Sequence, residues 1–71
     1  MVINMQLHQL LRFISMNTAI MLFDIQGIEI CRVASKYDIN IDLYEYPVLE
    51  ISCGPSFLNN SLHSIHITIQ K

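Results

Sequence analysis

The chain ends in a regular alternation of polar and apolar residues over positions 62–71. Successive side chains of a β-strand point to opposite faces of a sheet, so a period of two indicates a strand with one buried face. We therefore predict a strand at about residues 63–70, in which His66 faces water or a partner. The residues predicted to face a core are Ile65, Ile67 and Ile69.

The N-terminal segment has the different spacing of an amphipathic helix. Its apolar residues recur three and four positions apart, which places them on one stripe of a helix. Asn4 is a suitable N-cap and Asn17 marks the exit, so the helix is expected at about residues 4–15. The residues of the stripe are Ile3, Leu7, Leu10, Leu11 and Ile14.

Two apolar runs that flank a turn predict a β-hairpin, with strands at about residues 18–25 and 28–35. Asp24 suits the first position of a turn, and Gly27 suits the left-handed position that follows. The first strand is apolar on both faces, which is typical of a central strand with a cover on each side. A helix over 28–37 is the alternative for the second run, but its Ile, Cys and Val residues are weak helix formers, which favours the hairpin.

The sequence after the hairpin is compatible with two structures, and a further strand follows it. Residues 39–44 alternate, so they form either a third strand or a short helical turn capped by Asn40. A strand at about 48–53 follows, and Gly54-Pro55 is expected to stop it. Its residues predicted to share one face are Leu49, Ile51 and Cys53. The predicted fold class is α+β, in a single domain over 1–71: an N-terminal amphipathic helix packed on an antiparallel sheet of four or five strands.

Composition adds an expectation about assembly. Apolar residues make up 52% of the 71 residues, while charged residues make up only 14%, against a typical value of about 25%. A core of this size supplies roughly 3–5 kcal/mol of net stability without help. We therefore expect a homo-oligomer that covers surplus apolar surface from Met21, Phe23 and neighbouring strands.

Charge and hydropathy argue against several partners and compartments. The four basic residues form no cluster of three, and the formal charge is −2, so neither nucleic acid nor a membrane surface is expected as a partner. Polar residues interrupt the N-terminal third, which therefore resembles neither a signal peptide nor a membrane span. The expected compartment is the cytoplasm, where Cys31 and Cys53 would be reduced, buried hydrophobes; a bridge between them is the alternative.

No motif in the chain predicts catalysis, a metal or a cofactor. His63 and His66 form an H-x-x-H, but three positions along a strand put the two rings on opposite faces. Cys53 lies between an isoleucine and a turn, with little basic charge in sequence to activate a thiolate. The chain holds only two glycines and no glycine-rich phosphate loop. We therefore expect a non-enzymatic binding protein.

The segment richest in binding chemistry is residues 32–46. It combines two cations with three tyrosines, which suit stacking and charge-assisted hydrogen bonds at interfaces and ligand pockets. Packing at the edge of the core is the alternative role for the tyrosines. The candidate binding residues are Arg32, Lys36, Tyr37, Asn40, Tyr44 and Tyr46.

The order of motifs along the chain resembles a class of small phage proteins. The motifs are Leu10, Leu11 and Ile14, then Ile20-Met21-Leu22-Phe23-Asp24, Gly27, Ile30, Val48-Leu49-Glu50-Ile51 and Ile65-His66-Ile67. This order is similar to that of helix-plus-β-meander accessory proteins of phages that infect AT-rich bacteria. The resemblance implies a non-enzymatic, anti-defence binder that inhibits a host protein. The alternative that it implies is an oligomeric sponge that sequesters a small nucleotide signal at intersubunit pockets.

Overall fold

A computed structural model of the chain describes residues 5–55 and 63–71. Within those residues the chain forms one α-helix, two short 3-10 helices and four strands, so the predicted α+β class is confirmed. In chain order the elements are α1 (Leu7–Leu11), β1 (Ile20–Phe23), β2 (Glu29–Val33), η1 (Lys36–Asp38), η2 (Ile41–Leu43), β3 (Val48–Pro55) and β4 (His63–Ile69).

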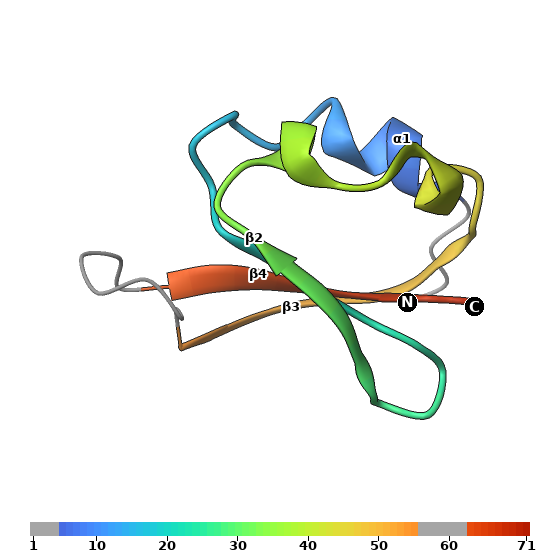
Figure 1. The fold of residues 1–71 in the computed structure, drawn as a ribbon. Coiled ribbons are helices and arrows are strands. Elements are labelled where there is room, and N and C mark those ends of the chain that lie inside the picture. The colour runs from blue at the N-terminus through green and yellow to red at the C-terminus, as the bar shows by residue number, and fades with distance from the viewer. Residues whose placement is uncertain (1–4, 56–62) are drawn as a thin grey trace.

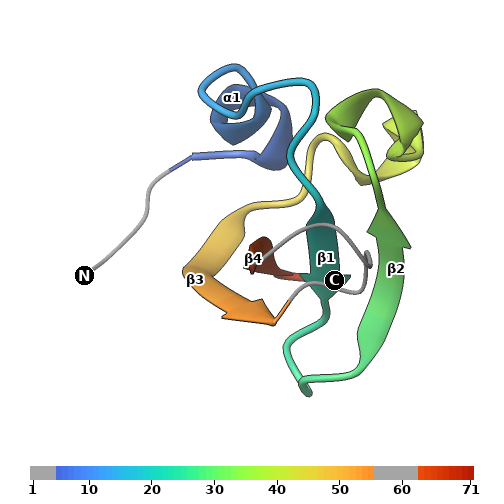
Figure 2. The same ribbon diagram turned by 90° about the vertical axis from the view of Figure 1, so that its left-hand side faces the viewer.

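The four strands form one mixed sheet (Figure 1), and their order, β2-β1-β4-β3, is visible in Figure 2. β1 pairs antiparallel with β2 and β3 pairs antiparallel with β4, but β1 and β4 run parallel to each other at the centre. The prediction of an antiparallel sheet is wrong at this central pair. Alternation along a strand specifies which side chains face the core, but it does not specify which strand lies alongside.

The helix and both 3-10 helices lie on one side of the sheet, and the core lies between them and the strands (Figure 1, Figure 2). The predicted inward residues Ile67 and Ile69 are fully buried, and Ile65 is half-buried. Burial of each fully buried isoleucine side chain contributes about 1.5–3 kcal/mol to the stability of the fold. The other core residues are Leu7, Leu10, Leu11, Ile14, Ile20, Leu22, Ile39, Leu43 and Val48.

α1 is shorter than the predicted helix at 4–15, although Leu7, Leu10, Leu11 and Ile14 of the predicted apolar stripe are buried; Ile3 lies outside the described residues. Asn4 lies outside the described residues, and Gln6 precedes the first helical residue. The first free N–H groups of the helix donate to another segment: Leu7 N–H to the Tyr46 carbonyl and His8 N–H to the Tyr44 carbonyl, both at 3.0 Å. After Leu11 the chain continues as turns, because the next hydrogen bonds span three residues instead of four.

The structure distinguishes between the alternatives that the sequence allowed for two segments. Residues 29–33 form the returning arm of a hairpin, and the Asp24 carboxylate accepts from the Gln26 and Ile28 N–H groups at 2.8 and 3.0 Å. Gly27 adopts a positive φ of 81° in this turn, a conformation that other residues avoid. Residues 41–43 form the helical turn, with the Asn40 side chain as its cap, accepting from the Asp42 N–H at 2.9 Å.

β3 departs from its prediction in length and in burial. Gly54 and Pro55 do not stop the strand but continue its pairing with β4, opposite Ser64 and His63. An edge strand tolerates proline because the missing N–H can face away from the sheet. The register of β3 shifts next to Leu49, and the three residues predicted to share one face, Leu49, Ile51 and Cys53, are all exposed.

The two cysteines are free thiols, as expected, but only one of them is sheltered. Cys31 is half-buried, whereas Cys53 is exposed, so the prediction of two buried cysteines is wrong for Cys53. The residues lie on β2 and β3, at opposite edges of the sheet. Three strand spacings of about 4.8 Å each separate them by roughly 14 Å, which is too far for a disulfide within one chain.

Candidate binding cleft

A small cleft lies where α1, η1 and the end of η2 meet. Its volume is about 180 Å³, and it is lined by His8, Leu11, Arg12, Lys36, Tyr37 and Tyr44. None of these described lining residues carries a carboxylate. We call this hollow the cationic cleft.

The helix supplies one wall of the cationic cleft through simple helical spacing. His8, Leu11 and Arg12 stand at positions i, i+3 and i+4, which share one face of a helix. Leu11 is buried, whereas Arg12 is exposed. The wall is therefore apolar at its base and positively charged at its rim.

The opposite wall is held to the helix at two points. The Lys36 ammonium donates to the Leu11 carbonyl at 2.8 Å, in a part-buried contact. This carbonyl, at the C-terminal end of α1, also accepts from the Ile14 N–H at 3.2 Å, so Lys36 is its second donor. Near the start of α1, the His8 N–H donates to the Tyr44 carbonyl at 3.0 Å. The walls of the cleft are therefore fixed before any ligand arrives.

The positive charges of the cationic cleft are not balanced by acids. Lys36 donates to a neutral carbonyl, and its ammonium lies 5.5 Å from the centre of the Tyr37 ring, within the range of a cation–π interaction. Within the described part of the chain, the Arg12 guanidinium has neither an ion pair nor a hydrogen bond. The cleft therefore has the charge complementary to an anion.

The structure brings together three of the six predicted binding residues: Lys36, Tyr37 and Tyr44 all line the cationic cleft. Asn40 and Tyr46 line a different hollow of about 410 Å³ beside β2, together with Asp38 and Asp42. The sixth residue, Arg32, lies in neither hollow. The single surface predicted from sequence is therefore divided between separate parts of the molecule.

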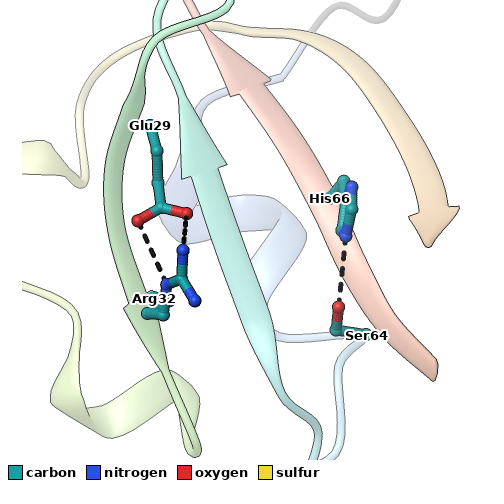
Figure 3. Close-up of polar contacts among 4 residues, drawn as sticks. All are labelled: Glu29, Arg32, Ser64 and His66. Atoms are coloured by element: carbon teal, nitrogen blue, oxygen red, sulfur yellow. Dashed lines mark hydrogen bonds and ion pairs between the residues drawn. The ribbon is translucent and has the colours of Figure 1, made fainter. Parts of the chain in front are cut away.

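Arg32 lies on the face of the sheet opposite the helices, where it binds Glu29 (Figure 3). Its guanidinium donates to both carboxylate oxygens, at 2.6 and 3.1 Å. The hydrogen bond to Glu29, followed by the negative charge of that carboxylate, raises the pKa of Arg32. Its charge is matched within its own strand.

Two residues of the cationic cleft, His8 and Arg12, were missed by sequence reasoning. Their four-residue separation on the polar side of the helix is a signal that they share a face. Nothing in that spacing indicates that η1 packs next to them. The Lys36–Leu11 contact joins positions 25 residues apart.

Two of the potential nucleophiles, Cys31 and Ser64, are at least partly buried, whereas the Cys53 thiol is exposed. Burial, followed by the negative charge of Glu29, raises the pKa of the Cys31 thiol, which lowers the fraction of reactive thiolate. Ser64 is only 1% exposed, so its hydroxyl is inaccessible to a substrate. Among the described residues, no three His, Cys, Asp or Glu side chains gather to hold a metal ion.

His66 is more enclosed than a solvent-facing strand histidine. It is half-buried, its Nε2 lies 3.2 Å from the Ser64 hydroxyl (Figure 3), and its ring centre lies 5.5 Å from that of Phe23. The ring also stands over Gly54, where an added Cβ would overlap it. The His63 side chain lies outside the described residues.

Large apolar side chains are exposed near the cationic cleft. Phe13 follows Arg12 and is 81% exposed, and Tyr37 in the cleft wall is 67% exposed. Ile41 is 72% exposed and lines an adjoining hollow of about 620 Å³ that shares His8 and Tyr44 with the cleft. We use the name helical surface for Phe13, Ile41 and the lining of the cationic cleft together.

Comparison of the chain with protein-family models, curated proteins and solved structures found no significant match. None of the helices in the described ranges is both long and apolar enough to cross a membrane.

Proposed function

We propose that this chain is a small, non-enzymatic binding protein that attaches to a protein partner through its helical surface. The observation that carries the proposal is the exposure of Phe13, Tyr37 and Ile41 around a cationic cleft. Aromatic residues, arginine and accessible apolar side chains are the groups that supply most of the energy of protein interfaces. The free energy falls when a partner covers an exposed Phe or Ile and removes its apolar surface from water.

The cationic cleft by itself is too small to enclose a small molecule. Pockets that enclose a small ligand measure about 300–1,000 Å³, whereas the cationic cleft measures about 180 Å³. The adjoining hollow of about 620 Å³ is large enough, but Asp42 and Glu45 in its lining would repel an anionic ligand. A nucleotide sponge is the second candidate, supported by two tyrosine rings beside Arg12 and Lys36. That function would require a second chain to complete the pocket.

The proposed setting follows from the resemblance to phage accessory proteins. In that setting the partner is a host protein, and inhibition follows from covering its functional surface. The two free thiols are in keeping with the cytoplasm, where cysteines remain reduced.

Self-association is part of the proposal. The edge strand β3 exposes Leu49 and Ile51, each by more than 40%, and an edge strand offers unpaired backbone groups to another strand. We expect light scattering to give a mass of at least two chains, and Ile51→Lys to reduce it to one. A wild-type mass of one chain would contradict this part of the proposal.

The binding function can be tested by capture from a bacterial host lysate. The test bait carries Phe13→Ser and Ile41→Ser. The control bait carries Ile25→Ser and Ile28→Ser, which change two apolar residues of the β1–β2 turn that are each 59% exposed. We expect the wild type and the control to retain the same protein, and the test bait to lose it.

Two results would contradict the proposed function. Equal retention by the test and control baits would exclude the helical surface as the binding site. Purification of the wild type with a bound nucleotide and without a protein would favour the sponge.

A further inference from the structure

The charges of the helical surface identify the chemistry of its partner. Of the four Lys and Arg residues in the chain, Arg12 and Lys36 line the cationic cleft. Arg32 is neutralised by Glu29 on the other side of the sheet. Half of the lysine and arginine charge of a net-negative protein is therefore concentrated in one small hollow without an acid in its lining.

We propose that the cationic cleft binds the carboxylate of an Asp or Glu side chain in an acidic segment of the partner protein; this inference rests on the proposed function. The planar guanidinium of Arg12 matches a carboxylate with two parallel hydrogen bonds. Lys36 uses one of its three N–H groups on the Leu11 carbonyl and keeps two for a ligand. The cleft can therefore hold a carboxylate from two sides.

The contact between Lys36 and Leu11 lowers the entropic cost of this binding. A free lysine loses considerable rotamer freedom when it binds a ligand. In this fold Lys36 is already held by the helix end and lies beside the Tyr37 ring. Only Arg12 must be ordered by the incoming carboxylate.

The acids next to the cleft determine the orientation of the partner segment. Asp42 and Glu45 line the adjoining hollow, which shares His8 and Tyr44 with the cleft. A second acidic residue placed there would be repelled, whereas an apolar residue could contact Ile41. We therefore infer a segment with one acidic residue in the cleft and apolar residues on either side, facing Phe13 and Ile41.

The test uses a defined probe, the blocked peptide acetyl-Leu-Leu-Glu-Leu-Leu-amide, and its matched control, in which glutamine replaces glutamate. Each peptide is titrated into ¹⁵N-labelled protein, and chemical shifts are followed for Arg12, Lys36 and Tyr37. We expect the glutamate peptide to bind about fivefold more tightly than the glutamine peptide, since an exposed pair contributes up to about 1 kcal/mol. The difference should shrink as salt is added.

Two variants identify the residue responsible. Arg12→Gln should remove the preference for glutamate, and Arg12→Lys, which keeps the charge but loses the planar fork, should retain part of it. Because Arg12 is exposed, both variants should fold, which their amide spectra would verify. Equal binding of the two peptides to the wild type, or an unchanged preference in Arg12→Gln, would overturn the inference.

The competing ligands are tested in the same way. Inorganic phosphate and AMP are titrated into the wild type, and tighter binding of either than of the glutamate peptide would overturn a carboxylate ligand in favour of a phosphate. The proposed function is tested separately, by whether the Phe13→Ser/Ile41→Ser bait still captures the partner protein. If that bait loses its protein while Arg12 shows no preference for glutamate, the function stands and the carboxylate site does not.

Discussion

The polar side chains of the cationic cleft and those on the opposite face of the sheet differ in whether they have partners within the protein. On the sheet, Arg32 binds Glu29 and His66 lies beside Ser64, so these polar groups have partners within the same strand. In the cleft, Arg12 has no such partner among the described residues, and Lys36 donates to a neutral carbonyl. Two exposed arginines of one chain therefore differ in their surroundings: the charge of Arg32 is matched within its own strand, and the charge of Arg12 is not matched by any described residue.

The strongest test of the sheet face as a purely structural region is Gly54→Ala. The added Cβ would overlap the His66 ring, and the ring could move only by leaving Ser64 and Phe23. We expect a loss of about 1–3 kcal/mol in the free energy of unfolding, measured by urea denaturation.

The double variant Gly54→Ala/His66→Ala provides the control for that overlap. Removal of the ring should make room for the new methyl group, so the double variant should be more stable than the sum of the single effects predicts. Strict additivity would show that Gly54 is required for another reason.

Lys36→Met should have the next largest effect, and it separates the two roles of the cleft. The substitution keeps the apolar stem but removes the hydrogen bond to the Leu11 carbonyl. We expect a loss of about 1 kcal/mol in the free energy of unfolding. Arg12→Met, the matched change at the rim, should stay within about 0.5 kcal/mol of the wild type; an equal loss in both would contradict the assignment of Lys36 as the structural member.

The smallest effect is expected at Arg32. Its side chain is 50% exposed, and exposed ion pairs contribute little to stability. Arg32→Gln should leave the thermal unfolding midpoint unchanged and should keep the preference of the cleft for the glutamate peptide. A loss of that preference would show that the preference reports the net charge of the protein instead of the local site.

Local patterns in the sequence account for much of the fold. The spacing of Leu7, Leu10, Leu11 and Ile14 and the alternation of Ile65, Ile67 and Ile69 correctly indicate the inward faces of their elements. The parallel pairing of β1 with β4 was missed because it depends on contacts between distant segments. Periodicity constrains neighbours in sequence, whereas strand order depends on how the whole chain closes.

The sequence could bring together only those residues of the cationic cleft that are near one another along the chain. Lys36, Tyr37 and Tyr44 are close in sequence, and their composition alone marked them as a binding segment. Arg32 lies apart from them, because its register opposite Met21 puts its side chain on the face of the sheet away from the helices. The bulge concerns Glu29: Phe23 pairs with Glu29 and Leu22 with Cys31, which leaves Ile30 as the extra residue. In a regular strand, Glu29 and Arg32 would point to opposite faces; the bulge puts them on the same face, where they pair.

The most direct measurement of the central claim compares Arg12→Gln with Arg32→Gln as capture baits. Both variants replace an exposed arginine with glutamine and change the net charge equally, but they act on opposite sides of the sheet. Quantitative mass spectrometry should find the same captured protein on the wild-type and Arg32→Gln baits, and a clear loss of it from Arg12→Gln. Equal retention by the two variants, or a loss from Arg32→Gln alone, would contradict the claim that the unmatched charge of the cationic cleft recognises the partner.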